Sequence, residues 1–216
     1  MTRPAKPPGP DFAFELDAKR AGAKRIAGVD EAGRGPLAGP VTAAAVTLDM
    51  RNLPAGLNDS KKLSAAARDR LAHEIRDSAD CSVVHVWIEE IDSLNIYHAS
   101  LLAMCRALAG LREQADFALI DGNAMPRDLP MPGRAVVKGD ALCLSIAAAS
   151  ILAKTERDRV MVDLAQHYPG YGWDRNAGYP TPEHKRALIE LGVTPYHRRS
   201  FAPVHNILCK PTTTTN

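Results

Sequence analysis

The chain has 216 residues, of which 45% are hydrophobic and 24% are charged, and this composition is typical of a globular domain. Its 27 lysine and arginine residues nearly balance its 25 aspartate and glutamate residues. The formal net charge of +2 therefore excludes a generally polybasic protein and gives no hint of a nucleic-acid partner.

The cysteines and the termini indicate the setting of the protein. No Cys-x-x-Cys pair is present, which argues against a zinc site or a disulfide framework and favours a reduced, cytoplasmic setting. The first ten residues are proline-rich and polar, unlike a secretory signal. We expect a flexible extension over residues 1–22, one domain over residues 23–210 and a disordered tail over residues 211–216. Without a membrane-spanning segment or a dimer signature, a monomer with no membrane contact is predicted.

The first half of the chain begins with two predicted strands. Residues 24–30 form a strand that enters a glycine-rich loop, and residues 41–48, rich in small and β-branched side chains, form its partner. The pattern then predicts a helix, a strand and a second helix, over residues 64–78, 82–88 and 89–112 respectively. Ser64 is the expected N-cap of the first of these helices.

The second half begins with a short buried strand over residues 117–121, and residues 136–137 add another. From residue 140 to residue 160 the chain is helical and at first apolar on all sides, which is typical of a buried helix. A later helix spans residues 182–191. Antiparallel strands followed by alternating strands and helices predict the α/β class.

Acidic residues stand at the ends of three predicted elements. Asp30 and Glu31 end the first strand, where a regular strand would point them to opposite faces. Both can face one site only if the strand breaks at the glycine-rich segment over residues 32–36. Asp121 ends a second strand, and Asp140 lies where the apolar helix begins, at the end whose dipole favours a carboxylate.

Carboxylate oxygens of this kind are hard ligands, which suit Mg²⁺ or Mn²⁺ better than zinc. Several carboxylates that converge on two such ions form a site for phosphodiester hydrolysis. Alternatively, Asp121 and Asp140 are a turn residue and a helix cap, and spacing alone does not decide between these interpretations.

Seven motifs in the chain resemble ribonuclease HII, in the order of that family, from about residue 24 to residue 204. They are GVDEAGRGPLAGPV, DSKKLS, IDGN, KGD, SIAAASILAK, GYPTPEH and HRRSFAPV. Several are long and unusual, and the first is nearly diagnostic by itself. The related HIII enzymes usually carry glutamate at the fourth acid and an added N-terminal domain, whereas this chain has Asp140 and a short extension.

The resemblance implies a ribonuclease H-like mixed sheet flanked by helices, with a helical C-terminal region. It implies that Asp30, Glu31, Asp121 and Asp140 are the catalytic residues and hold two Mn²⁺ or Mg²⁺ ions. The implied substrates are RNA–DNA hybrids and duplex DNA that contains ribonucleotides. The implied reaction hydrolyses the RNA strand, or cuts 5′ of a single embedded ribonucleotide, and leaves 3′-hydroxyl and 5′-phosphate ends.

The resemblance also implies a set of substrate-binding residues. The Gly33-Arg34-Gly35 loop senses the ribose 2′-hydroxyl largely through its backbone, which glycine allows to approach a ligand closely. Tyr179 packs on the deoxyribose beside the ribonucleotide. Taken alone, the loop would be read as a tight turn, and the tyrosine as a half-buried surface residue.

Basic residues complete the expected substrate surface. The candidates for phosphate contacts are Lys61, Lys62, Arg198 and Arg199, and Asn123 of the IDGN motif joins the set. Clustered basic residues also occur on solvated faces with no ligand, so this alternative stays open. Two rival functions stay open as well. One is a resolvase-like nuclease of the same fold that cuts DNA without needing ribose, and the other is a hybrid-binding module without catalysis.

Overall fold

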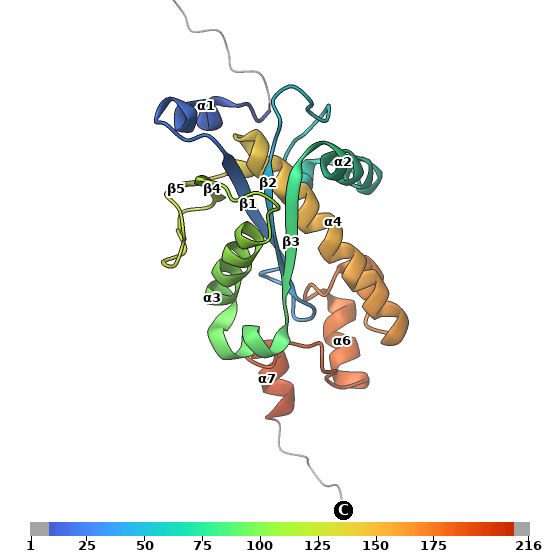
Figure 1. Ribbon diagram of the computed structural model, residues 1–216. Helices are drawn as coiled ribbons and strands as arrows, with labels where there is room; N and C mark the ends of the chain where they lie inside the picture. The colour runs from blue at the N-terminus through green and yellow to red at the C-terminus, as the bar shows by residue number, and fades with distance from the viewer. Residues whose placement is uncertain (1–8, 210–216) are drawn as a thin grey trace, which may run out of the picture.

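A five-stranded sheet forms the centre of the computed structural model, which describes residues 9–209 (Figure 1). Its strands are β1 (Ile26–Ala32), β2 (Val41–Thr47), β3 (Asp80–Val86), β4 (Phe117–Asp121) and β5 (Gly133–Val136). They lie in the order β3-β2-β1-β4-β5. The first three strands pair antiparallel, whereas β4 and β5 extend the sheet in parallel with β1. This mixed sheet confirms the predicted α/β class.

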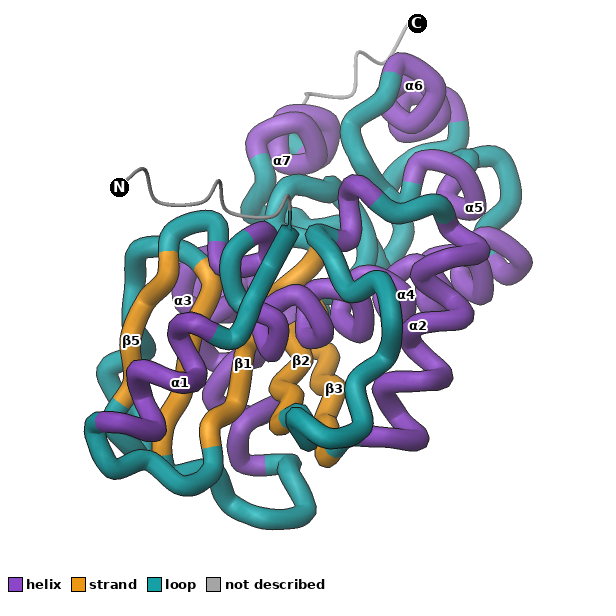
Figure 2. Tube along the Cα trace, turned by 90° about the horizontal axis from the view of Figure 1, so that it is seen from above, coloured by secondary structure: helices purple, strands orange, loops and turns teal. Residues whose placement is uncertain are grey.

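Helices surround the sheet (Figure 2). They are α1 (Ala13–Arg20), α2 (Ala65–Ser78), α3 (Ile88–Ala109), α4 (Leu144–His167), α5 (Trp173–Asn176), α6 (Pro182–Glu190) and α7 (Ala202–Leu208). The Ser64 side chain accepts a hydrogen bond from the Ala67 amide, which confirms the predicted N-cap of α2. The short helices α5 and α7 carry too few turns to give a periodic signal, and the sequence did not predict them. Between residues 9 and 209, no helix combines the length and hydropathy needed to cross a membrane.

The two faces of the sheet are covered by different helices. Helix α3 packs on one face, and α4, with α2 beside it, packs on the other. The backbone of α4 comes so close to β1 that a β-carbon on Gly28 would collide with the backbone at Ser145 and Ile146. The predicted apolar helix is therefore buried against the sheet, and the close approach brings its side chains next to the end of β1.

The start of α4 differs from the prediction. Asp140 lies in a separate 3₁₀ turn (Gly139–Ala141), and α4 begins at Leu144, so the α4 dipole does not act on Asp140 as expected. Glu15 instead occupies the N-terminal end of α4, where its Oε1 accepts a hydrogen bond from the Ser145 amide at 2.8 Å. A carboxylate at this position stabilises the helix because it satisfies a free amide and faces the positive end of the dipole.

Glu15 belongs to α1, so the expectation of a flexible extension through residue 22 is wrong for residues 13–20. Helix α1 is held because Phe14 and Ala18 pack against Ile26 and Ile146. The sequence did not predict this short helix, because it follows a proline-rich, polar start. Residues 1–8 of the expected extension, Lys210 and the expected tail over residues 211–216 lie outside the described residues.

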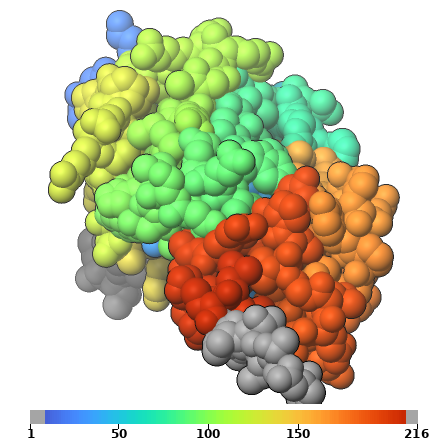
Figure 3. All heavy atoms as spheres, turned by 90° about the horizontal axis from the view of Figure 1, so that it is seen from below, coloured from blue at the N-terminus to red at the C-terminus, as the bar shows by residue number. Residues whose placement is uncertain are grey.

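The helical C-terminal region expected from the resemblance packs beyond one end of the sheet. Figure 3 shows it in orange and red beside the green segment that contains α3. Asp92 of α3 links the two regions, because its carboxylate accepts hydrogen bonds from the amides of Arg199 and Ser200 at 3.0 and 2.9 Å. Leu37, which follows β1, packs with Leu188 and Val204 from this region. The loop after β1 is thus enclosed by the C-terminal helices.

Candidate active site

Three of the four predicted acids lie at one end of the sheet, where β1 and β4 finish. Asp30 and Glu31 are the fifth and sixth residues of β1, and Asp121 ends the parallel neighbour β4. Because Val29 pairs with Ile120, Asp30 and Asp121 come next to each other along the two strands. Strand β1 continues through Ala32, which pairs with Thr42, so the predicted break at residue 32 does not occur. Both acids of β1 nevertheless line one cleft, because β4 ends beside them and leaves this end of the sheet open.

The cleft has a volume of about 420 Å³. It is lined by Asp30, Glu31, Ala32, Gly33, Arg34, Gly35, Ser60, Lys61, Asp121, Ser150, Lys154, Arg157 and Tyr179. The fourth acid, Asp140, lies behind Lys61, whose Nζ is 3.0 Å from Asp140 Oδ2. The Gly139 amide donates to Asp121 Oδ1 at 2.7 Å, and this bond joins the end of β4 to the turn that carries Asp140.

The acids of the cleft repel one another in a poorly solvated place. Burial raises the pKa of Asp30 well above its usual value, and the negative charges of Glu31 and Asp121 raise it further. Burial also raises the pKa of Glu31, although Arg34 opposes the shift. The pKa of Asp121 is raised by burial and by the charge of Asp140. The ionised forms of Asp30, Glu31 and Asp121 are therefore disfavoured in the cleft, and a bound cation relieves this condition.

The donor set fits a hard divalent cation, because every candidate ligand is a carboxylate oxygen. Within residues 9–209, no three His, Cys, Asp or Glu side chains are grouped closely enough to hold a metal ion as they stand. The carboxylates instead have separate partners: Asp140 faces Lys61, Asp121 faces the Gly139 amide, and Glu31 faces Arg34 at 3.5 Å. Ion binding thus requires these side chains to turn toward a common centre.

The structure brings the two expected sugar-contacting elements together. Gly33, Arg34 and Gly35 line the cleft, and so does Tyr179 from the loop before α6. A β-carbon on Gly35 would lie 3.4 Å from Cε1 of Tyr179, so the ring stands directly beside the loop. Tyr179 is 43% exposed, which leaves a face of its ring free. The loop and the tyrosine, 144 positions apart in the sequence, thus form one surface.

The basic candidates fall into two groups. Lys61 lines the cleft, whereas Lys62, Asn123 and Arg199 are exposed outside the residues that line it. Arg198 is buried, with 0% of its surface exposed, so the expectation that it contacts a phosphate is wrong. Its guanidinium donates to backbone carbonyls instead, which consumes the donors that a phosphate would need.

Sequence reasoning missed four residues of the cleft. Lys154 and Arg157 reach it from α4, and the Ser150 hydroxyl lies 2.7 Å from that of Ser60. Ser150 therefore bonds across to the segment before α2. Charged residues on a helix that is otherwise buried were the signal that could have identified Lys154 and Arg157.

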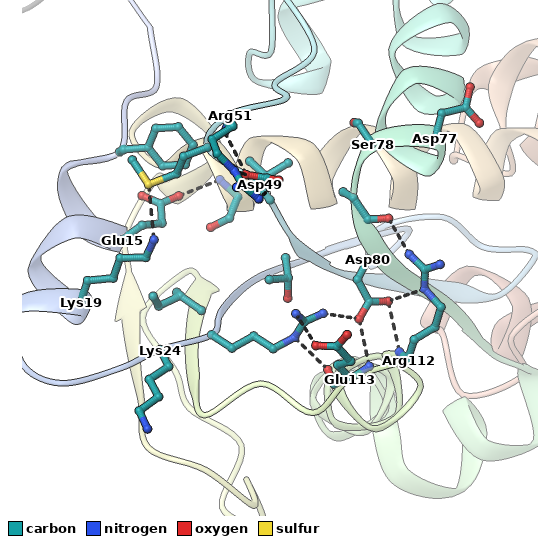
Figure 4. A pocket seen from close by; sticks show the side chains of 18 residues that line it. Glu15, Lys19, Lys24, Asp49, Arg51, Asp77, Ser78, Asp80, Arg112 and Glu113 are labelled. Atoms are coloured by element: carbon teal, nitrogen blue, oxygen red, sulfur yellow. Dashed lines mark hydrogen bonds and ion pairs between the residues drawn. The ribbon is translucent and has the colours of Figure 1, made fainter.

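A larger cavity, of about 550 Å³, lies at the opposite end of the sheet (Figure 4). The carboxylate of Asp80 is paired there: Arg25 and Arg112 lie 2.6 and 3.2 Å from it, and the Glu113 amide donates to the same group. Burial by itself would raise the pKa of Asp80, but these donors together lower it. The buried carboxylate of this larger cavity thus lies in an ion-pair network, whereas those of the smaller cavity repel one another.

A mixed sheet with carboxylates at the ends of β1 and β4, and a buried helix behind them, defines a ribonuclease H-like hydrolase. A model of the family described as ribonuclease HII matches residues 27–204 of the chain. The chain belongs to the ribonuclease HII family and is a ribonuclease H of type HII.

Individual relatives agree with this assignment. Ribonuclease HII of Paracoccus denitrificans (strain Pd 1222) is 66% identical over 206 residues, which cover 95% of this chain and 98% of that protein. The enzyme of Ruegeria sp. (strain TM1040) is 63% identical over 199 residues, covering 92% and 87% of the two chains. The crystal structure of ribonuclease H2 from Pyrococcus horikoshii OT3 matches with a TM-score of 0.75 and 30% identity. That match covers 85% of this chain and 97% of the other.

Proposed function

We propose that this endonuclease hydrolyses the RNA strand of RNA–DNA hybrids and also cuts duplex DNA 5′ of a single embedded ribonucleotide. The products are 3′-hydroxyl and 5′-phosphate ends. One observation carries the proposal: carboxylates that repel one another, with Asp30 buried, share a cleft with the Gly33–Gly35 loop and Tyr179. Groups suited to phosphodiester hydrolysis therefore lie beside groups suited to sensing a ribose next to a deoxyribose.

Asp30, Glu31, Asp121 and Asp140 would hold two Mn²⁺ or Mg²⁺ ions. When bound, such ions supply a hydroxide nucleophile and stabilise the charge on the leaving oxygen. The contribution of the chain is to supply these carboxylates from neighbouring elements, so that they can turn toward the ions. Lys61, now 3.0 Å from Asp140, is released when that carboxylate turns, and its ammonium is then free to contact a phosphate.

The substrate is held by the remaining candidates. Backbone groups of Gly33, Arg34 and Gly35 contact the ribose 2′-hydroxyl, and the exposed ring face of Tyr179 packs on the adjacent deoxyribose. Lys62, Asn123 and Arg199 lie outside the cleft and contact the phosphates farther along the strands. We also propose that the enzyme acts as a monomer in the cytoplasm, and light scattering at working concentration tests the monomer.

The test compares two DNA duplexes that differ by one ribonucleotide, each incubated with Mn²⁺ or Mg²⁺. Cutting of the ribonucleotide-containing duplex alone, with 3′-hydroxyl ends, is the expected result. Cutting of both duplexes would identify a nuclease that does not need ribose, and binding without cutting would identify a binding module. The metal dependence is tested separately by thermal unfolding, because an ion that binds the folded state raises the melting temperature. We expect that rise in the wild type and a much smaller rise in Asp30→Asn.

A further inference from the structure

Two arginine side chains are buried beneath the surface that would read the substrate. Arg157 of α4 is 1% exposed and Arg198, between α6 and α7, is 0% exposed. Neither forms a salt bridge within residues 9–209, since every guanidinium hydrogen bond of the two goes to a backbone carbonyl. Burial lowers their pKa values, to about 10 and about 9 respectively, so both stay charged at neutral pH.

Arg198 holds the loop that follows β1. Its guanidinium donates to Gly33 O at 2.6 Å and to Arg34 O at 3.0 Å, and therefore contacts the backbone of the sugar-sensing loop from inside. The same group donates to Gly39 O and Pro40 O, each at 3.0 Å, where the chain enters β2. One planar group thus ties both ends of the loop together.

Arg157 joins this loop to the segment that carries Tyr179. It donates to Ala38 O at 3.1 Å and to Pro40 O at 3.0 Å on one side, and to Ala177 O at 2.9 Å on the other. Ala177 has a φ of 48°, a left-handed conformation that costs an alanine energy and needs such support.

The glycines around Arg157 show how closely these backbones approach. A β-carbon on Gly33 would collide with the side chain of Arg157, and one on Gly178 would collide with Ala38 O. The Leu37 amide also donates to Gly178 O at 2.8 Å. The far side of the tyrosine segment has its own support, because His184 Nδ1 lies 2.9 Å from Tyr179 O. Arg157 is therefore a side chain that hydrogen-bonds to both segments.

We propose that Arg157 and Arg198 are positioning residues that divide the recognition of the ribose–deoxyribose junction between them. Arg198 fixes the loop whose backbone senses the 2′-hydroxyl, and Arg157 fixes the spacing between that loop and Tyr179. This inference rests on the proposed function, since it assumes that the loop and the tyrosine contact successive sugars.

The two roles give different kinetic results. Every substrate of the enzyme has a 2′-hydroxyl at the cut, so a displaced loop impairs long hybrids and single ribonucleotides alike. Only the single ribonucleotide has a deoxyribose beside it for Tyr179. A changed spacing therefore impairs that substrate selectively. Lysine is the informative replacement, because it keeps the charge but cannot span several carbonyls as a planar guanidinium does.

The experiment measures kcat/KM of Arg198→Lys and Arg157→Lys on a single-ribonucleotide duplex and on a long RNA–DNA hybrid. Arg198→Lys is expected to lower both values by about 100-fold, the size of effect that a small misplacement produces. Arg157→Lys is expected to lower the first value about 30-fold and the second less than about 3-fold. Circular dichroism and thermal unfolding identify a temperature at which each variant is folded.

Arg76→Lys is the matched control, since Arg76 is a partly buried arginine that donates to Glu156, the neighbour of Arg157 on α4. It should reduce stability without changing the ratio of the two kcat/KM values. Equal losses on both substrates for Arg157→Lys, or unchanged kinetics in either test variant, would overturn the inference. A wild type that fails to cut the single-ribonucleotide duplex would instead overturn the proposed function, so the two failures are distinguishable.

Discussion

Acidic side chains are buried at both ends of the sheet, but their surroundings shift their pKa values in opposite directions. At the end with the larger cavity, Asp80 receives two guanidinium groups and the amides of Arg112 and Glu113, and its pKa is lowered. At the end with the smaller cleft, Asp30 lies among other carboxylates, and its pKa is raised. The first arrangement stabilises the fold. The second arrangement destabilises the fold. Proteins retain such an arrangement where a charged ligand binds.

The difference teaches where to look for function in this molecule. Between these two ends, size favours the first cavity, at about 550 Å³ against about 420 Å³. The pKa shifts favour the smaller one, because burial and neighbouring carboxylates raise the pKa of Asp30, whereas the donors around Asp80 lower its pKa. The following changes test whether the two ends differ as described.

The largest expected effect comes from Asp30→Asn. Cleavage should fall by about 1,000-fold or more, because a lost ligand removes several kcal/mol of charge stabilisation in the transition state. The metal-free variant should unfold at a higher temperature than the wild type. The raised pKa of Asp30 means that its ionised form opposes folding at neutral pH, and the amide removes that charge. Gel-based cleavage and differential scanning calorimetry measure the two effects. A variant that keeps activity, or that melts earlier, would contradict the contrast.

Two glycines, one at each end, make a second test. Gly35→Val should lower cleavage by about 10- to 100-fold with an unchanged melting temperature, because its side chain would enter the space between the loop and Tyr179. Gly22 lies in the turn between α1 and β1, with a φ of 104° and open space around it. Gly22→Ala should leave cleavage unchanged and cost about 1 kcal/mol of stability, because alanine is strained in that conformation. Parallel losses of activity and stability in Gly35→Val would show that this residue serves the fold.

Asp80→Asn is the counterpart of the first change. It should lower the free energy of unfolding by about 2–3 kcal/mol, because the amide cannot accept from two guanidinium groups and two amides. The cleavage rate of the folded variant should stay at the wild-type value. Urea denaturation measures the loss of stability, and a cleavage assay at about 25 °C measures the activity of the folded variant. A stability equal to that of the wild type would mean that the hydrogen bonds of Asp80 stabilise the fold no more than hydrogen bonds to water do.

The smallest expected effect is the pH dependence of the stability difference between the wild type and Asp80→Asn. A carboxylate with a lowered pKa contributes stability above its unfolded value, near 3.8 for Asp80, and loses it as the pH falls through the folded value. The stability difference between wild type and Asp80→Asn should therefore be constant from neutral pH to about pH 5 and shrink below about pH 4. Urea titrations across this range measure it. A difference that grows on acidification would reverse the assigned sign.

Local patterns in the sequence predicted most of the elements. Residues 41–48 and 117–121 carry strand patterns, and Ser64 stands before a periodic helix, so neighbours in the chain suffice to define them. The same patterns failed for α1, a short helix in a polar segment, and for the start of α4. Both failures have one cause, because Glu15 and Ser145 contact each other across 130 positions of sequence. Contacts of that kind leave no periodic trace.

The sequence by itself determined the class of fold and the ribonuclease HII family, because their patterns and motifs are local runs of residues. The four acids remain its prediction for the site. Only the tertiary structure decided which charged groups are buried and what they contact. Arg198 has a side chain that could bind a phosphate, yet it is buried and donates hydrogen bonds to backbone carbonyls within residues 33–40. Burial depends on how distant segments pack, and a side chain bonded to the backbone inside the fold has the same letter in the sequence as one that faces solvent.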